Sequence, residues 1–71
     1  MYIKIMYDDY NEMFECDRIA ETEGCLQFSI NNEIVTQYDP SCKPPARIFV
    51  MNDNGKTIDH YSFFNTTLVK E

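Results

Sequence analysis

The stretch from Arg47 to Phe64 decides the fold, and it reads RIFVMNDNGKTIDHYSFF. Two runs rich in β-branched and aromatic residues flank the Asn54-Gly55 pair, which is the strongest short-range signal for a β-hairpin. Asparagine and glycine both tolerate the positive φ angles that tight hairpin turns require. We therefore expect an antiparallel hairpin that turns at Asn54-Gly55.

The pattern allows two registers for this hairpin. A two-residue turn would place Ile48 opposite Tyr61. A three-residue loop with a glycine bulge would instead place Ile48 opposite His60, and the same loop would pair Val50 with Ile58. The choice matters because a shift of one residue moves the side chains of one strand to the other face. We favour the three-residue loop, since it pairs β-branched residues in the middle of the ladder.

The rest of the chain alternates apolar and polar residues over short segments, as half-buried strands do. The segments with this pattern are 2–7, 12–19, 25–30 and 33–38. Ile19 breaks the alternation, so a bulge or strand end is expected near Asp17-Arg18. Three prolines exclude residues 39–45 from the interior of a ladder. Residues 64–71 are expected to form a frayed tail or a last short strand.

No window of the sequence has a helical hydrophobic period, and 71 residues allow one domain. We therefore expect a single all-β domain over residues 1–71, a small antiparallel meander of about six short strands. The sheet should be strongly curved or closed into a small barrel, because closure removes open edges. Its inward-facing side chains should be Ile3, Ile5, Tyr7, Phe14, Cys16, Leu26, Phe28 and Ile30.

The composition favours a cytoplasmic protein. No apolar run approaches the roughly 20 residues of a membrane span, and no signal peptide is visible. The three cysteines are widely spaced and contain no Cys-x-x-Cys motif, as is usual for reduced thiols. Residues with AT-rich codons (Phe, Tyr, Met, Ile, Asn, Lys) predominate, which suggests a low-GC bacterium, or a phage or mobile element living in one.

Acidic side chains give the largest functional signal. The net charge is −6, and residues 1–40 hold nine acids against two bases. Such charge ordinarily keeps a small protein soluble, but it can also form a negative face for a basic protein partner. Direct nucleic-acid binding is disfavoured, because phosphates require a basic patch. The residues expected on the acidic face are Glu12, Glu15, Asp17, Glu21 and Glu23.

Catalytic and metal sites have little support in the sequence. One set of side chains could supply a Cys₃His zinc site: Cys16, Cys25, Cys42 and His60. Their spacings match no paired zinc-knuckle pattern, so we expect dispersed buried thiols and no metal. A Cys–His nucleophilic pair would need Asp59 or Asp39 to orient the imidazole. In the absence of a paired acid–base motif, we expect no enzyme activity and no cofactor.

Aromatic side chains point to self-association. Five Tyr and five Phe exceed what one face of so small a sheet needs, although a core packed with large residues is the alternative. The segments 2–7 and 57–64 could be exposed sheet edges, which a second copy would cover. We therefore expect a homodimer with Tyr61, Phe63 and Phe64 near its interface.

Together these features favour a non-enzymatic binding protein. The most concrete form is a phage or mobile-element accessory protein whose acidic face inhibits a nucleic-acid-handling host or defence protein. The alternative is a homo-oligomeric binder of a small anionic or aromatic ligand such as a nucleotide. In that case tyrosine and phenylalanine rings would stack on the ligand, and Lys43, Arg47 and Lys56 would hold its anionic group.

Overall fold

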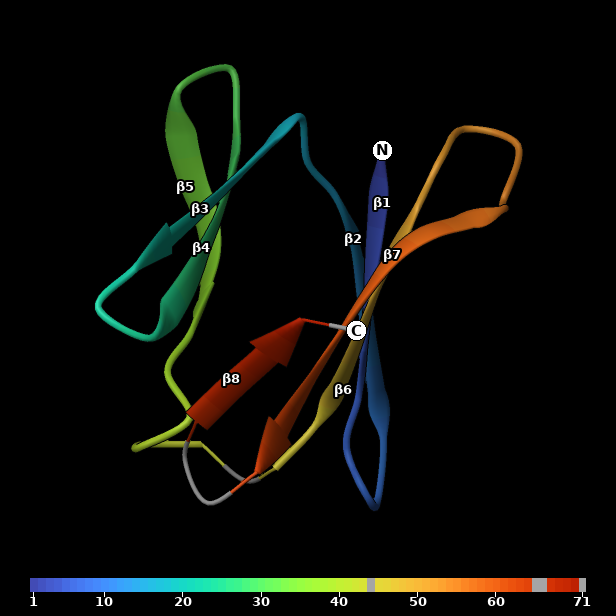
Figure 1. Cartoon of the computed structure of the whole chain (residues 1–71). Helices are drawn as coiled ribbons and strands as arrows, with labels where there is room; N and C mark the ends of the chain where they lie inside the picture. Colours follow the sequence, from blue (N-terminus) through green and yellow to red (C-terminus); the bar gives the residue numbers. More distant parts are fainter. Residues whose placement is uncertain (44, 65–66, 71) are drawn as a thin grey trace.

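Two antiparallel sheets make up the fold (Figure 1). The computed structural model describes residues 1–43, 45–64 and 67–70, with side chains as far as Ser62. The five-stranded sheet has the order β2-β1-β6-β7-β8, and the three-stranded sheet has the order β3-β4-β5. The strands are β1 (Tyr2–Met6), β2 (Asn11–Glu15), β3 (Arg18–Thr22), β4 (Cys25–Ile30), β5 (Glu33–Tyr38), β6 (Arg47–Met51), β7 (Thr57–Phe64) and β8 (Thr67–Lys70).

The chain passes from the first sheet to the second at Cys16-Asp17. The Cys16 N–H donates to the Met1 carbonyl (2.9 Å), which extends the β1–β2 ladder by one residue. The Asp17 N–H already donates to the Ser29 carbonyl of β4 (2.9 Å). The expected strand end near Asp17 is confirmed, whereas the expected single strand over 12–19 is wrong. The two halves of that segment belong to different sheets.

Two hairpins of the second sheet close through two-residue turns, at Glu23-Gly24 and at Asn31-Asn32. The Glu23-Gly24 turn between β3 and β4 has φ angles of 52° and 80°, and the Asn31-Asn32 turn between β4 and β5 has 52° and 66°. Positive φ at both central residues is the turn geometry whose twist matches that of the flanking strands. Asparagine and glycine reach it at low cost, so local sequence favours the Asn31-Asn32 turn and the Gly24 position, whereas Glu23 takes up a conformation that its side chain disfavours.

The β6–β7 hairpin closes through a three-residue loop, as expected. The Gly55 N–H donates to the Asn52 carbonyl (3.0 Å), and the Asn52 N–H donates to the Lys56 carbonyl (2.9 Å). Gly55 has a φ of 81°, which fits a glycine bulge. The Asn52 side-chain oxygen also accepts hydrogen bonds from two loop N–H groups, at 3.0 Å each.

Beyond this loop the expected register is wrong. A second bulge leaves Ile58 without a partner in β6, so that Val50 pairs with Asp59 and Ile48 pairs with Tyr61. The expected pairs Val50–Ile58 and Ile48–His60 do not form. The bulge turns the Tyr61 ring toward the core on the same face as Ile48, and it leaves Ile58 57% exposed. Burial of a large aromatic side chain favours this arrangement over the regular ladder.

The two sheets share one core, and the expected closed or strongly curved single sheet is wrong. In the part of the chain that the structure describes, the second sheet covers the apolar face of the first instead of continuing it. The edges are therefore β2, β8, β3 and β5, while the predicted edge segments 2–7 and 57–64 lie inside the first sheet. The buried apolar residues are Ile3, Ile5, Tyr7, Cys16, Leu26, Phe28, Tyr38, Ala46, Ile48, Val50 and Tyr61.

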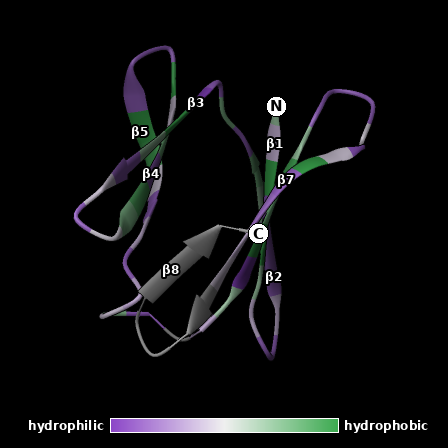
Figure 2. Ribbon diagram, in the orientation of Figure 1, coloured by the Kyte–Doolittle hydropathy of each residue, from purple (hydrophilic) through white to green (hydrophobic). Residues whose placement is uncertain are grey.

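The hydropathy of the chain follows this arrangement. Figure 2 shows apolar and hydrophilic residues together along strands such as β3 and β5, and hydrophilic residues in the turns. The described residues include no helix long and apolar enough to span a membrane.

Candidate functional site

The two predicted acidic residues of β2 lie on opposite faces of the first sheet. Glu12 pairs with the buried Ile5 and is half-buried on the core-facing side. Glu15 pairs with Tyr2 and is exposed on the outer face. The negative charge of Glu15, and its hydrogen bond from the Tyr2 hydroxyl, raise the pKa of Tyr2. The structure therefore does not bring these two carboxylates together.

The other three predicted acids belong to the second sheet and its connections, and all are exposed. The Asp17 carboxylate accepts a hydrogen bond from the Asn31 N–H (3.0 Å), which ties the crossover to the β4–β5 turn. Glu21 lies near the end of β3, and Glu23 lies in the turn that follows. No lysine or arginine in the described part of the chain forms an ion pair with any of the five predicted acids.

The predicted interface aromatics are not available as a group. Tyr61 is only 4% exposed and packs in the core, and the side chains of Phe63 and Phe64 lie outside the described residues. The strand pairing instead places three other apolar side chains on the outer face of β1 and β2. They are Tyr2, Met6 and Met13, which are 38%, 37% and 64% exposed.

The cysteines and the histidine are divided between the two sheets. Cys16 is fully buried in the core, and this burial raises the pKa of its thiol. His60 lies on the outer face of the first sheet, where its ring stacks on Phe49 with centroids 4.6 Å apart and an interplanar angle of 4°. Among the described residues, no three His, Cys, Asp or Glu side chains gather as metal ligands.

The Asp39 carboxylate lies near two thiols, those of Cys42 and Cys25. It accepts hydrogen bonds from the Ser41 hydroxyl (2.6 Å), the Ser41 N–H (2.9 Å) and the Cys42 thiol (3.6 Å). The Cys25 thiol at the start of β4 donates to the Glu23 carbonyl (3.9 Å) and lies close enough to the Asp39 carboxylate to affect its pKa. The Ser41 hydrogen bonds chiefly lower the pKa of Asp39, while burial and then the Asp39 charge raise the pKa of Cys25. Asp39, Ser41 and Cys42 are close in sequence, so only the approach of Cys25 depends on the fold.

The three bases predicted to hold an anion do not converge. The Lys43 ammonium donates to the Gln37 carbonyl (2.9 Å) and so caps part of the open edge of β5. Arg47 alternates with the buried Ile48 and faces outward on the other sheet. Lys56 follows the turn of the β6–β7 hairpin.

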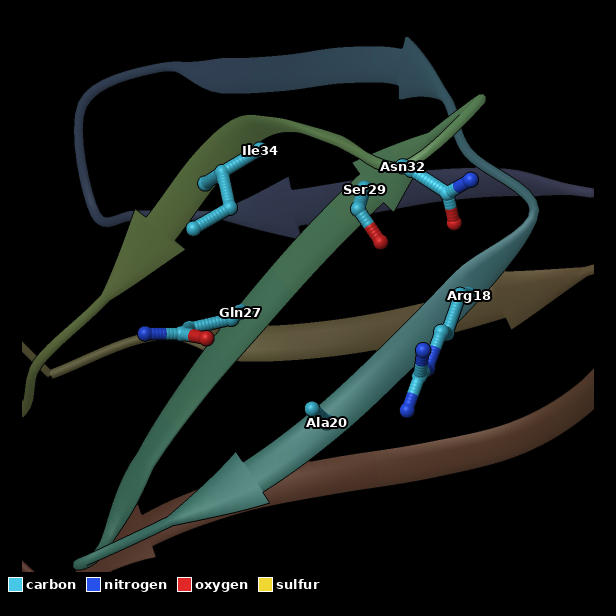
Figure 3. Close-up of a pocket in the computed structure, with 6 residues that line it drawn as sticks. All are labelled: Arg18, Ala20, Gln27, Ser29, Asn32 and Ile34. Carbon is cyan, nitrogen blue, oxygen red and sulfur yellow. The ribbon is translucent and has the colours of Figure 1, made fainter.

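A pocket of about 250 Å³ lies instead on the outer face of the three-stranded sheet (Figure 3). Its lining residues are Arg18, Ala20, Gln27, Ser29, Asn32 and Ile34. In β3 and β4 they lie on the outward face of the strands, and none of them was among the site residues predicted from the sequence. Comparisons with protein-family models, curated proteins and solved structures find no match for this chain.

Proposed function

We propose that the protein is a non-enzymatic binding protein that occupies a basic surface of a protein partner. The supporting observation is the set of exposed carboxylates that no described base neutralises. With a net charge of −6, these groups produce a negative field that steers a basic partner toward the protein. Binding by this mechanism is fast at low salt and weakens as ions screen the charges.

The partner class that fits this chemistry best is a nucleic-acid-handling protein. Such proteins carry basic grooves for phosphates, and carboxylates on a small rigid scaffold can compete for those grooves. An accessory protein of a phage or mobile element that inhibits a host or defence nuclease would act in this way. DNA should then displace the protein from its partner.

The geometry indicates which carboxylates to test. Glu12 is half-buried, Glu15 bonds to Tyr2, and Asp17 holds the β4–β5 turn through Asn31. Charge reversal at any of these three positions would also disturb the fold. Glu21 and Glu23 are exposed at the β3–β4 hairpin, and no hydrogen bond to either side chain is found among the described residues.

The experiment compares E21K/E23K with the control D8K/D9K. Both double variants change the net charge equally, and Asp8 and Asp9 are exposed in the β1–β2 turn. Affinity capture from host lysate at low salt should recover a basic partner with wild-type protein and with D8K/D9K, but not with E21K/E23K. Recovery of no partner, or equal loss with both variants, would contradict the proposal.

The same proposal includes a homodimer, with an interface that differs from the one the sequence suggested. Tyr2, Met6 and Met13 form an exposed apolar cluster on the outer face of β1 and β2. Packing of this cluster against a second copy would remove its apolar surface from water. Lys4, opposite Met13, and Glu15, opposite Tyr2, lie on the same face and would need partners across the interface.

A further inference from the structure

The pocket of the second sheet is built from two cross-strand rows. The pairing places Arg18 opposite Ser29, and Ser29 opposite Ile34, so one row spans all three strands. Ala20 lies opposite Gln27 in the next row. Because alanine has the smallest of these side chains, the space beside the Arg18 stem stays open, as Figure 3 shows.

The lining chemistry suits an anion. Arg18 is the one charged residue of the lining, and it forms no ion pair with a described acid. In Figure 3, Ser29 and Asn32 lie on the same side of the pocket as Arg18, while Gln27 lies across from them. The guanidinium offers a rigid planar fork of donors, and hydroxyl and amide groups can add further hydrogen bonds.

We propose that this pocket binds a small monoanionic carboxylate, with the carboxylate on Arg18 and the rest of the ligand against Ala20 and Ile34. A planar carboxylate matches the guanidinium fork in two parallel hydrogen bonds. A phosphate dianion fits less well, because one guanidinium neutralises only one charge and the protein carries a net charge of −6. The volume of about 250 Å³ also favours a small ligand over a nucleotide.

This site is separate from the proposed partner surface. It uses none of the five predicted acids, and it lies on the outer face of the second sheet. Failure of partner capture would therefore leave the pocket proposal unaffected, and the reverse is equally true.

The test follows side-chain ¹⁵N signals of Arg18, Gln27 and Asn32 by NMR during titration with three probes. The probes are N-acetylglycine, its neutral amide N-acetylglycinamide, and inorganic phosphate. N-acetylglycine should give saturable shifts in all three side chains, the neutral amide should give none, and phosphate should bind more weakly. Equal shifts with the neutral amide, or no shift with N-acetylglycine, would overturn the proposal. Tighter binding of phosphate would overturn the choice of a carboxylate.

Three variants distinguish binding in this pocket from unspecific attraction of an anion to any positive charge. R18Q removes the charge-assisted hydrogen bonds and should weaken N-acetylglycine binding by about tenfold or more. R47Q makes the same charge change on the other sheet and should leave the affinity unchanged. A20L fills the pocket without changing the charge and should abolish binding, with the backbone NMR spectrum confirming the fold of each variant. Equal affinities of R18Q and R47Q would refute the assignment.

Discussion

The Phe14 ring of β2 meets the Phe28 ring of β4 edge to face, with centroids 5.3 Å apart and an interplanar angle of 70°. Because β2 and β4 belong to different sheets, this contact joins the two layers directly. Edge-to-face pairs contribute about 0.5–1.5 kcal/mol beyond the area they bury. Phe28 is fully buried, whereas Phe14 keeps part of its surface in water on an edge strand.

Truncation of Phe28 should therefore lower the stability of the fold strongly. The change F28A should cost about 3–5 kcal/mol, since it leaves a cavity in the shared core. Small domains have about 5–15 kcal/mol of total stability, so the variant should unfold at very low urea concentration. F14A should cost clearly less, and F28L less than F28A. Urea unfolding followed by circular dichroism measures all three, and an unchanged midpoint for F28A would show that the layers do not pack here.

The sequence predicted local geometry well and long-range arrangement poorly. The loop at Asn54-Gly55 depends on the φ preferences of its own residues, so the sequence locates it directly. Alternation also identified Leu26 and Phe28 as inward-facing, and both are fully buried. Alternation does not say which sheet lies opposite an apolar face, so the division into two sheets was missed. The bulge at Ile58 also depends on tertiary structure, because the burial of Tyr61 in the core stabilises it. The local pattern of the hairpin therefore did not predict it.

The candidate site was harder to predict for the same reason. The Arg18 pocket joins residues that only the folded topology brings together. In the Asp39 cluster, Ser41 and Cys42 are neighbours of Asp39 in sequence, and only Cys25 comes from another element. The acidic signal, by contrast, is a property of composition and was visible at once. What composition could not show is that Glu12 and Glu15 face opposite sides of one strand.

The β6–β7 hairpin offers a test of its two bulges. Gly55 has a φ of 81°, so G55A should lower stability by about 1 kcal/mol through backbone strain. Ile58 is exposed and unpaired in its bulge, so I58T should change stability by less than about 0.5 kcal/mol. Thermal unfolding of G55A and I58T measures the two changes in stability, and G55A should show the larger loss. A large loss of stability in I58T would instead support the regular Val50–Ile58 pairing.

The three cysteines should differ in chemical reactivity. Iodoacetamide should modify the exposed Cys42 first and the buried Cys16 last, because access and thiolate formation both limit the reaction. Glutathione disulfide should link Cys25 to Cys42, since both thiols reach the Asp39 carboxylate. In that exchange the two thiols lose their protons and electrons to one glutathione disulfide, which leaves as two glutathione thiols.

Mass spectrometry of the oxidised protein identifies the link. The control C16S should still form the intramolecular disulfide, whereas C42S should not. A disulfide that includes Cys16 would contradict the burial of that residue in the core.

Tyr7 should make the protein sensitive to alkali. Its ring stacks on Tyr10 with centroids 4.7 Å apart, and burial raises its pKa from 10.0 to about 12. The folded state therefore holds the phenolic proton more tightly than the unfolded state. This contribution is fully present below pH 10 and is lost as the pH rises toward 12. Y7F should reduce the loss of stability in this range, and Y10F, at the exposed neighbour, is the matched control.

The proposed dimer makes the last prediction. Met13 is 64% exposed in the apolar cluster of β1 and β2, and Ile58 is 57% exposed in the bulge of β7. A new carboxylate at Met13 would have to lose its hydration if this cluster forms the interface, even with Lys4 opposite it in β1, so M13E should weaken dimerisation. I58E introduces the same charge at a similarly exposed position and should leave dimerisation nearly unchanged. Sedimentation velocity over a range of concentrations measures both, and a monomeric wild type at every concentration would rule out the dimer.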